Sequence, residues 1–229
     1  MKTKINKSNI KLTDIRDDID SIDSELQRLI NQRAELAKKI GLAKDKTGTS
    51  TDFYKPEREA DVLRSVIERN NGPLRDEEIA RLFREIMSAC LAQQEPLKVG
   101  FLGPEGTFTQ AAVYKQFGHS VRALPYGSID EVFHEVESHA ADFGVVPIEN
   151  STEGTVNNTL DMFVSSPLKI CGEIELRIEH HLLGRVKDIK NIQRICAHEQ
   201  ALAQCRGWVR EYLPEVELCL LYTSPSPRD

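Results

Sequence analysis

The sequence predicts two domains of different class, an all-α module followed by an α/β domain, and three observations lead to this prediction. Up to about residue 94, apolar residues recur at helical spacing and strand patterns are nearly absent. At Gln94-Glu95-Pro96 the character of the chain changes. From Lys98 onward strand patterns alternate with helical ones, an order that predicts a mostly parallel sheet with ligands at the carboxyl ends of its strands.

Composition narrows the class of protein. With 229 residues and 40% hydrophobic content, the chain is long enough for two ordinary domains. Its net charge of -6 argues against a nucleic-acid or anionic-membrane partner. The five cysteines are odd in number and form no CxxC pair, which argues against a disulfide framework or a zinc site. No apolar run resembles a signal peptide or a membrane span, so we expect a soluble, cytoplasmic protein.

The first predicted helix covers residues 13–44 and carries an apolar stripe. The stripe consists of residues at helical spacing: Ile15, Ile19, Ile22, Leu26, Leu29, Leu36 and Ile40. A helix of this length extends over about 45 Å, which is more than a lone small domain covers. We therefore expect a second copy of the chain to pack along it.

Two cations share one side of this helix. Arg33 and Lys44 differ by eleven residues, which leaves them only about 20° apart around the axis and about 16 Å apart along it. Such a pair suits the two ends of a small dianion. Arg16 lies about 25 Å before Arg33 and on another side, so it reaches the same site only from an antiparallel partner helix.

Two shorter helices are expected to complete the module. One begins near Pro56, a residue type favoured in the first turn, and ends at Asn70-Asn71-Gly72-Pro73. The other begins near Asp76, with acidic residues in its first turn, and runs to about Gln94.

The α/β part has a strand and helix order that follows from its sequence pattern. Ser128 and Glu131 have the spacing of a capping box at a helix start. Strands are expected at 98–102, 121–124, 142–147 and 194–197 and over much of 168–183, and helices at 128–138, 156–163 and 201–212 and up to about 117. Residues 220–229 carry no periodicity. An α/β domain that begins at Lys98 would normally continue, so we expect this one to be incomplete.

The helical module contains stretches that resemble a known family. The stretches are IRDDIDSIDSELQRLINQRAELAKKIGLAK, FYKPEREADVLRSV and IARLFREIMSACLAQQEPLKV, and they cover nearly all of residues 10–98. They resemble the all-helical chorismate mutases, in particular the mutase part of the bifunctional chorismate mutase/prephenate dehydratases of phenylalanine synthesis. The resemblance implies a three-helix chain in an intertwined homodimer that rearranges chorismate to prephenate.

The resemblance also implies a role for several residues by position. It places Arg16 in the site of the other protomer. Six residues would line the site of their own chain: Arg33, Lys44, Arg58, Glu59, Cys90 and Gln94. Cys90 stands where some members have a serine. Lys44 and Gln94 would donate to the ether oxygen, where negative charge grows as the bond breaks. Arg16 and Arg33 would hold the carboxylates, and Glu59 with Arg58 would face the ring hydroxyl. Solvated surface charges are the alternative interpretation for each residue.

The α/β part resembles the prephenate dehydratase domain of the same family. VGFLGPEGTFTQAAV, FGVVPIENSTEGTVNNTLD, ICGEIELRIEHHLL and AHEQALAQC occur in order. The resemblance implies a fold like that of a two-lobed periplasmic binding protein, with the site between the lobes, and a reaction that expels water and CO2 from prephenate. The implied substrate-binding residues are Thr107, Glu149, Asn150, Ser151 and Gln204. His180-His181 lack a third ligand at metal spacing and are interpreted as structural.

One family motif is missing from these residues. In the family the threonine of a Thr-Arg-Phe motif protonates the leaving hydroxyl, and no such tripeptide occurs in the 229 residues. The sequence therefore predicts that the dehydratase half of this chain is inactive. Neither reaction calls for a metal or another cofactor. The expected domains are a mutase at 5–96, a partial dehydratase at 97–219, and a tail foreign to the family at 220–229.

Two other classes of protein fit parts of the pattern. A helical dimerisation module with an α/β domain that binds a small acid would make a non-catalytic sensor, and fold alone does not distinguish it from an enzyme. Such a dimeriser has no use for Arg33 and Lys44 in phase with its apolar stripe. A purely structural coiled coil is less consistent with the sequence, because the apolar pattern lacks sustained heptads.

Overall fold

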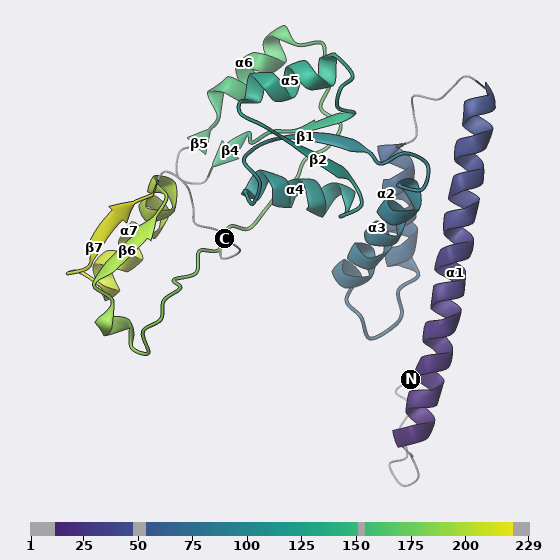
Figure 1. The fold of residues 1–229 in the computed structure, drawn as a ribbon, viewed down its shortest axis with the longest axis horizontal. Coiled ribbons are helices and arrows are strands. Elements are labelled where there is room, and N and C mark those ends of the chain that lie inside the picture. Colours follow the sequence, from purple (N-terminus) through teal and green to yellow (C-terminus); the bar gives the residue numbers. More distant parts are fainter. Residues whose placement is uncertain (1–11, 48–53, 151–153, 222–229) are drawn as a thin grey trace. The chain divides into compact units, whose positions relative to one another are not determined.

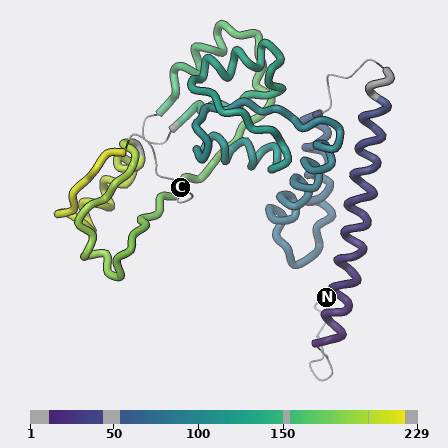
Figure 2. The backbone as a smooth tube through the Cα atoms, in the orientation of Figure 1, coloured from purple at the N-terminus to yellow at the C-terminus, as the bar shows by residue number. Residues whose placement is uncertain are grey.

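A computed structural model describes residues 12–47, 54–150 and 154–221 (Figures 1 and 2). The chain divides into two compact units. The first unit contains Met1–Lys98 together with Phe117–Arg122, and the second contains Val99–Gln116 and Ala123–Asp229. In the described ranges no helix combines the length and the apolar character that crossing a membrane requires.

The first unit is helical, as the sequence predicts. Its described helices are α1 (Leu12–Thr47), α2 (Pro56–Glu68) and α3 (Asp76–Leu91). Pro56 occupies the first turn of α2, and α3 has three acidic residues in its first turn, as expected from the dipole of a helix. α3 ends three residues before the predicted Gln94. α3 contacts both α1 and α2, and so forms the middle of the unit.

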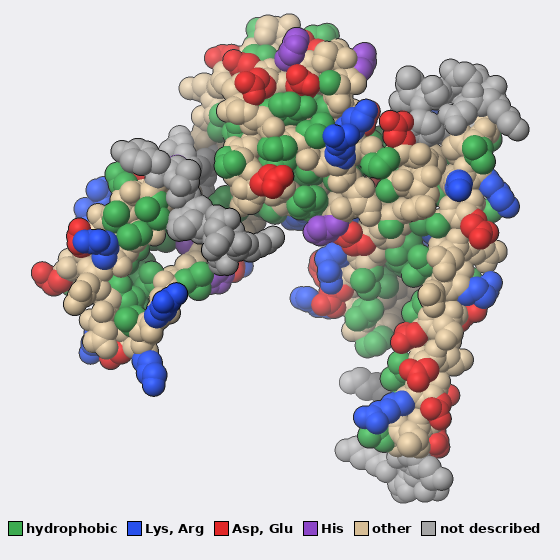
Figure 3. All heavy atoms as spheres, in the orientation of Figure 1, with side chains coloured by type: hydrophobic (Ala, Val, Ile, Leu, Met, Phe, Trp, Pro, Cys, Tyr) green, Lys and Arg blue, Asp and Glu red, His purple; other side chains and the backbone are tan. Residues whose placement is uncertain are grey.

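The apolar stripe of α1 is largely uncovered in a single chain. α1 has 36 residues, which corresponds to about 54 Å, and it runs well past the ends of α2 and α3 (Figures 1 and 2). The exposed members of the stripe are Ile15, Ile19, Ile22, Leu26, Leu29, Leu36 and Ile40. Figure 3 shows hydrophobic side chains, in green, that reach the surface of this unit. A row of this length is unusual on the surface of a protein that works as a monomer.

The segment Phe117–Arg122 packs on α3 although it follows the first helix of the α/β part in the chain. Gly118 has φ +76, and a Cβ added there would lie 2.5 Å from the Cβ of Ser88, so only glycine fits this approach. The backbone N–H of His119 donates to Glu85 Oε2 at 3.1 Å, and its Nδ1 lies 2.8 Å from Glu85 Oε1. These contacts attach the segment to the helical unit.

The second unit contains the predicted parallel sheet. Its described strands have the order β2-β1-β3, with β1 and β3 parallel and Val99 opposite Phe143. The elements are β1 (Lys98–Leu102), α4 (Phe108–Phe117), β2 (Arg122–Tyr126), α5 (Ile129–Glu137) and β3 (Phe143–Val145). Val99 and Phe101 of β1, Val113 of α4 and Val132 of α5 are fully buried and form the core. β1 is therefore the central, most buried strand, as its apolar sequence predicts.

The start of α5 realises half of the predicted capping box. The Ser128 hydroxyl accepts the N–H of Glu131 at 3.2 Å, as expected. The Glu131 carboxylate, however, accepts the N–H of Gly127 at 2.8 Å, one residue before the cap. The same two side chains therefore fix both the helix start and the turn that leads into it.

The strand structure expected over 168–183 is wrong. After β4 (Glu149–Asn150), β5 (Gly154–Thr155) and α6 (Asn157–Ser165), residues 166–184 run extended without strand pairing. The segment is contacted by α4, because the ammonium of Lys115 donates to the Glu175 carbonyl. β-propensity favours an extended backbone, but a strand also needs a neighbour to supply the ladder hydrogen bonds.

The last part of the unit is a small β-α-β assembly. It consists of a 3-10 turn η1 (Ile189–Asn191), β6 (Arg194–Ala197), α7 (Glu199–Tyr212) and β7 (Glu217–Leu220). β6 and β7 are parallel, with Ile195 opposite Leu218. Its core is the cluster of Ile195, Leu202, Val209 and Leu213. β7 is a strand that the sequence pattern did not reveal.

Candidate functional site

Apart from Arg16, the predicted mutase residues lie on α3, just after it, or on α1 and α2, which it contacts. Arg33 is half-buried on α1. Lys44 belongs to the same helix, but its side chain is outside the described structure. Gln94 follows the end of α3 and reaches α1, where its Oε1 lies 3.2 Å from the place a Cβ on Gly41 would take. Because Gly41 is one turn before Lys44, the structure brings Gln94 to the part of α1 that carries this cation.

The side chain of Gln94 is held by packing, and within the described part of the chain its amide oxygen is unpaired. Its Oε1 is buried and has no hydrogen-bond partner among the described residues. A buried amide oxygen without a partner costs about 1–3 kcal/mol. The close approach to Gly41, where a Cβ would be 2.9 Å from Gln94 Cγ, fixes the side chain in this place. Packing against a glycine therefore sets the position of an unsatisfied polar group.

Glu59 lies between α2 and α3 in a polar cluster. Its Oε1 is 3.5 Å from Nε of Arg84, and the two side chains are only 14% and 25% exposed. Burial raises the pKa of Glu59, while a hydrogen bond from Tyr54 and the positive charge of Arg84 act in the opposite direction. The ionised form of this carboxylate thus depends on two neighbours that the sequence analysis did not identify.

Arg84 carried a weak signal in the sequence. It is seven residues before the apolar Leu91, which places both on one side of α3. A cation in phase with apolar residues was the criterion that selected Arg33 and Lys44 on α1. The same criterion applied to α3 would have found Arg84.

The other predicted mutase residues differ in their surroundings. Cys90 is almost completely buried, at 2% exposure, on α3. Arg58 and Arg16 are exposed. Seventeen residues of α1 separate Arg16 from Arg33, or about 25 Å, so one chain does not bring them together. One chain does place the amide of Gln94 beside the face of α1 that carries the cations. It also provides the half-buried carboxylate of Glu59. Together these groups suit an anionic ligand that has a hydroxyl group.

In the second unit Thr107 serves as the cap of α4. Its hydroxyl donates to the carbonyl of Pro104 at 3.0 Å and accepts the N–H of Gln110 at 3.4 Å. The side-chain amide oxygen of Gln110 in turn accepts the N–H of Gly106 at 2.7 Å. Thr107 is half-buried. The turn after β1 is thereby held in one shape, with a helix N-terminus beside it.

The predicted residues Glu149, Asn150 and Ser151 follow β3. Glu149 is exposed, the side chain of Asn150 is not described, and Ser151 lies outside the described residues. The start of this loop is fixed by Thr159, which is fully buried and donates to the carbonyl of Pro147 at 2.6 Å. The position of the loop at the carboxyl end of a parallel strand is the usual place for ligand-binding residues in such sheets.

His180 connects two of the predicted dehydratase regions. Its Nε2 lies 2.5 Å from Oε1 of Gln204 on α7. Its ring also meets the ring of Phe108, which follows Thr107, edge-on at a centroid distance of 6.2 Å. These contacts are compatible with the structural role that the sequence predicts for His180, and they join segments that lie far apart in the chain. Within the described ranges no cluster of three His, Cys, Asp or Glu is placed to hold a metal ion.

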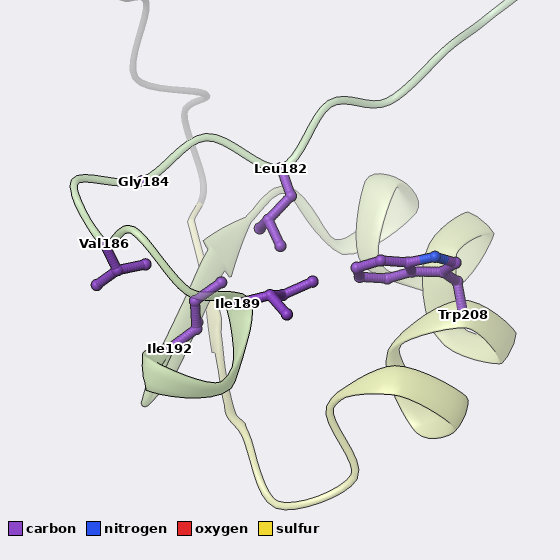
Figure 4. Close-up of a pocket in the computed structure, with 6 residues that line it drawn as sticks. All are labelled: Leu182, Gly184, Val186, Ile189, Ile192 and Trp208. Atoms are coloured by element: carbon purple, nitrogen blue, oxygen red, sulfur yellow. The ribbon is translucent and has the colours of Figure 1, made fainter.

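An apolar hollow of about 280 Å³ lies beside Trp208. Figure 4 shows Leu182 and Ile189 projecting into the space beside the indole ring, from the extended segment and from η1. Gly184, Val186 and Ile192 complete the lining. None of these six residues is charged, and none of them is among the residues predicted to bind prephenate.

Comparisons with known proteins place these features in a family. A model described as Prephenate dehydratase matches residues 99–224, which is more than half of the chain. A model described as Chorismate mutase type II matches residues 15–95.

Several curated relatives are similar along nearly the whole chain. A bifunctional chorismate mutase/prephenate dehydratase from Pseudomonas aeruginosa is 56% identical over 203 residues, covering 87% of this chain and 56% of its own length. Proteins of the same name from Aquifex aeolicus and Escherichia coli K12 are 43% and 30% identical. They cover 91% and 86% of this chain and 58% and 55% of their own lengths. The chain therefore spans a little over half of these relatives.

A solved structure is also similar in sequence. It is the prephenate dehydratase from Arthrobacter aurescens in complex with L-Phe, at 34% identity. The match covers 55% of this chain and 42% of the other chain, with a TM-score of 0.41.

Proposed function

The chain belongs to the prephenate dehydratase family, and from this membership and the helical unit in front we propose that it rearranges chorismate to prephenate in phenylalanine biosynthesis. The α/β unit would act on the product, prephenate. The observation that carries the first half of the proposal is the placement of Gln94 against Gly41 of α1, the helix of Arg33 and Lys44.

The rearrangement is intramolecular and needs no nucleophile, so the residues contribute by binding and orientation. Arg33 and Arg16 would hold the two carboxylates so that the side chain of chorismate folds over its ring. Lys44 and Gln94 would donate to the ether oxygen as its charge develops. Glu59, with Arg58 nearby, would accept the hydrogen bond of the ring hydroxyl, and Cys90 would line the floor of the site. No cofactor takes part in this proposal.

We propose a homodimer through the α1 helices. The exposed stripe of α1, from Ile15 to Ile40, supports this, since each such side chain gains roughly 1.5–3 kcal/mol when fully buried. The distance between Arg16 and Arg33 supports it as well, because an antiparallel partner helix is the way Arg16 would reach a site. The dimer would then have two equal sites, each built from both chains.

For the α/β unit we propose a prephenate dehydratase of the two-lobed, periplasmic-binding-protein-like type. Thr107, Glu149, Asn150, Ser151 and Gln204 would bind prephenate, and the His180 contacts with Gln204 and Phe108 support a place for His180 beside them. Because the 229 residues contain no Thr-Arg-Phe tripeptide, we expect these residues alone to form little phenylpyruvate. The proposed domains are 5–96 and 97–219, with 220–229 as a tail, and the proposed location is the cytoplasm.

The mutase proposal is tested by following the loss of chorismate absorbance. The purified chain should convert chorismate, and Lys44→Ala should lower kcat by a factor of about 100 or more, as expected when one donor to a developing oxyanion is removed. Lys39→Ala, an exposed lysine on another side of α1, is the matched control and should leave the rate unchanged. A wild-type chain that binds an aromatic acid but converts no chorismate would instead support the sensor.

The dehydratase proposal has a separate readout. Prephenate is added to the purified chain, and phenylpyruvate is measured by its absorbance in alkali. Little or no product is expected. Substantial phenylpyruvate formation would show that a donor other than the threonine of the missing motif protonates the leaving hydroxyl.

A further inference from the structure

Two members of a partly buried polar cluster between α2 and α3, Tyr54 and Arg84, have no assigned role in the mutase proposal. The cluster consists of Tyr54, Glu59 and Arg84, which come from the segment before α2, from α2 and from α3. Tyr54 is 9% exposed, and the side chains of Glu59 and Arg84 are 14% and 25% exposed. Buried charges of this kind are rare unless they are paired.

The ion pair of Glu59 with Arg84 differs from ordinary surface pairs of this chain. The pairs Arg28–Glu25 and Arg64–Asp61 join neighbouring turns of one helix, and their side chains are more than half exposed. Such pairs contribute little. Arg84, in contrast, reaches from one helix to a carboxylate on another, at 3.5 Å between Nε and Oε1.

The cluster is also incompletely satisfied. Nε of Arg84 is buried, and no hydrogen-bond partner for it exists among the residues that the structure describes. At 3.5 Å the carboxylate of Glu59 is too far for a good hydrogen bond but near enough for strong attraction. A small movement of Glu59 toward Arg84 would complete the bond, whereas a ligand hydroxyl would draw the carboxylate the other way.

We propose that Arg84 is a positioning residue of the mutase site, which keeps Glu59 charged and aimed at the ring hydroxyl of the substrate without touching the substrate itself. This inference rests on the proposed function of the helical unit. A carboxylate is a better acceptor for a hydroxyl than a carboxylic acid, and Arg84 supplies the positive charge that makes the carboxylate tolerable in a buried place.

The ionisation of Glu59 gives this role a measurable consequence. Burial raises the pKa of Glu59, and the described groups that oppose the rise are Tyr54, by a hydrogen bond, and Arg84, by its charge. Removing Arg84 therefore raises the pKa of Glu59 further. If catalysis uses the carboxylate form, the acidic limb of the pH profile must move to higher pH.

The experiment compares the full-length 229-residue chain with Arg84→Met, Arg84→Lys, Glu59→Gln and the double variant Arg84→Met/Glu59→Gln. Both kcat and KM for chorismate are measured from pH 4.5 to pH 9. For Arg84→Met we expect the acidic limb of the kcat/KM profile to move to higher pH by about one unit. This is the low end of the change that a nearby opposite charge causes in the pKa of a carboxyl group. Arg84→Lys keeps the charge and should stay near the wild type. In the Glu59→Gln background there is no carboxyl group at this position, so Arg84→Met should not shift the acidic limb of the pH profile.

The outcomes separate the inference from the function on which it rests. A wild type without mutase activity removes the proposed function. An active wild type together with a folded Arg84→Met variant whose acidic limb does not move overturns the role of Arg84. If Arg84→Met fails to fold, Tyr54→Phe decides. This substitution keeps the ring, whose centroid lies 5.6 Å from that of Phe117, and removes the hydrogen bond from Tyr54 to Glu59. The acidic limb of the pH profile should therefore move to higher pH, as in Arg84→Met. An unmoved limb in Tyr54→Phe overturns the inference.

Discussion

The helical unit and the α/β unit differ in the contacts that hold their proposed site residues. In the helical unit, Gln94 and Glu59 are held by neighbours on adjacent helices, namely Gly41 on α1 and Arg84 on α3. In the α/β unit, Thr107 is engaged as a helix cap, and Glu149 is exposed. The contacts of His180 with Gln204 and with Phe108 join distant parts of its predicted site.

The difference shows which parts of the chain must fold and pair before each kind of site can form. The contacts that position Gln94 and Glu59 come from other helices of the same unit, so one face of a site forms within a single unit. A site at the carboxyl ends of parallel strands needs every strand to find its neighbour first. Where the pairing is absent, as over residues 166–184, the side chains stay extended and mostly exposed. In the helical unit, the stripe of α1 from Ile15 to Ile40 is exposed.

The largest effect should come from breaking the proposed contact between α1 helices. Ile22→Asp puts a charge into the middle of the exposed stripe, so we expect the dimer to dissociate and mutase activity to fall by more than about 100-fold, since a buried unpaired charge costs several kcal/mol. Light scattering after size exclusion measures the dimer. Ser24→Asp, on the opposite side of the helix, is the control, and an Ile22→Asp variant that stays dimeric and active would refute the interface.

The next effect concerns the fixed position of Gln94. Gly41→Ala adds a Cβ that would lie 2.9 Å from Gln94 Cγ, so the amide must move. A displacement of about 1 Å in a catalytic group can cost about 100-fold, and we expect a loss of at least about tenfold in kcat.

The control for this substitution is Gly207→Ala on α7, where nothing lies within 4 Å of the added Cβ. Alanine is preferred to glycine within a helix, so this variant should keep full mutase activity. Unchanged kcat in Gly41→Ala would show that the contact between Gln94 and Gly41 does not position a catalytic group.

A core substitution tests whether the two units are independent. Leu202 belongs to the buried cluster of β6 and α7, and Leu202→Ala should destabilise this assembly by about 2–4 kcal/mol. Hydrogen exchange of α7 should increase, while mutase activity should stay unchanged. A parallel fall in mutase activity would show that the helical unit depends on the fold of the other unit.

The smallest effect is expected where Phe117–Arg122 packs on the helical unit. Burial acts to raise the pKa of Glu85, but the hydrogen bonds and charge of His119 and the charge of Arg81 lower it overall. Because the folded-state pKa is lowered, the stabilisation is present above the ordinary value and is lost as pH falls through the lowered pKa. Glu85→Ala should cost about 0.5–1 kcal/mol at neutral pH.

The amide of His119 reports this contact directly, because it donates to Glu85 Oε2. Its hydrogen exchange should be faster in Glu85→Ala than in the wild type, and in the wild type the protection should fall in acid. Equal exchange in both proteins would show that the contact does not hold the segment in solution.

Much of the helical unit and part of the sheet follow from the sequence. Apolar spacing and Pro56 fix α1 and α2 to within a few residues, and β1 and β6 match their predicted bounds. The failure over 168–183 has a physical reason, because strand propensity is local and pairing is not. Arg84 was not among the predicted residues, although it lies in phase with the apolar Leu91 on α3. The contacts of His180 with Phe108 and Gln204 could not be predicted, because local spacing does not show which side chains of other segments lie nearby.

The central claim is that each mutase site takes Arg16 from one chain and Lys44 from the other, and a mixing experiment tests it most directly. Arg16→Ala and Lys44→Ala are each expected to be nearly inactive alone. After the two are unfolded and refolded together in equal amounts, half of the dimers are mixed and each has one intact site, so about a quarter of wild-type activity should return. If the mixture remains as inactive as its components, or if Arg16→Ala alone is fully active, the shared site is contradicted.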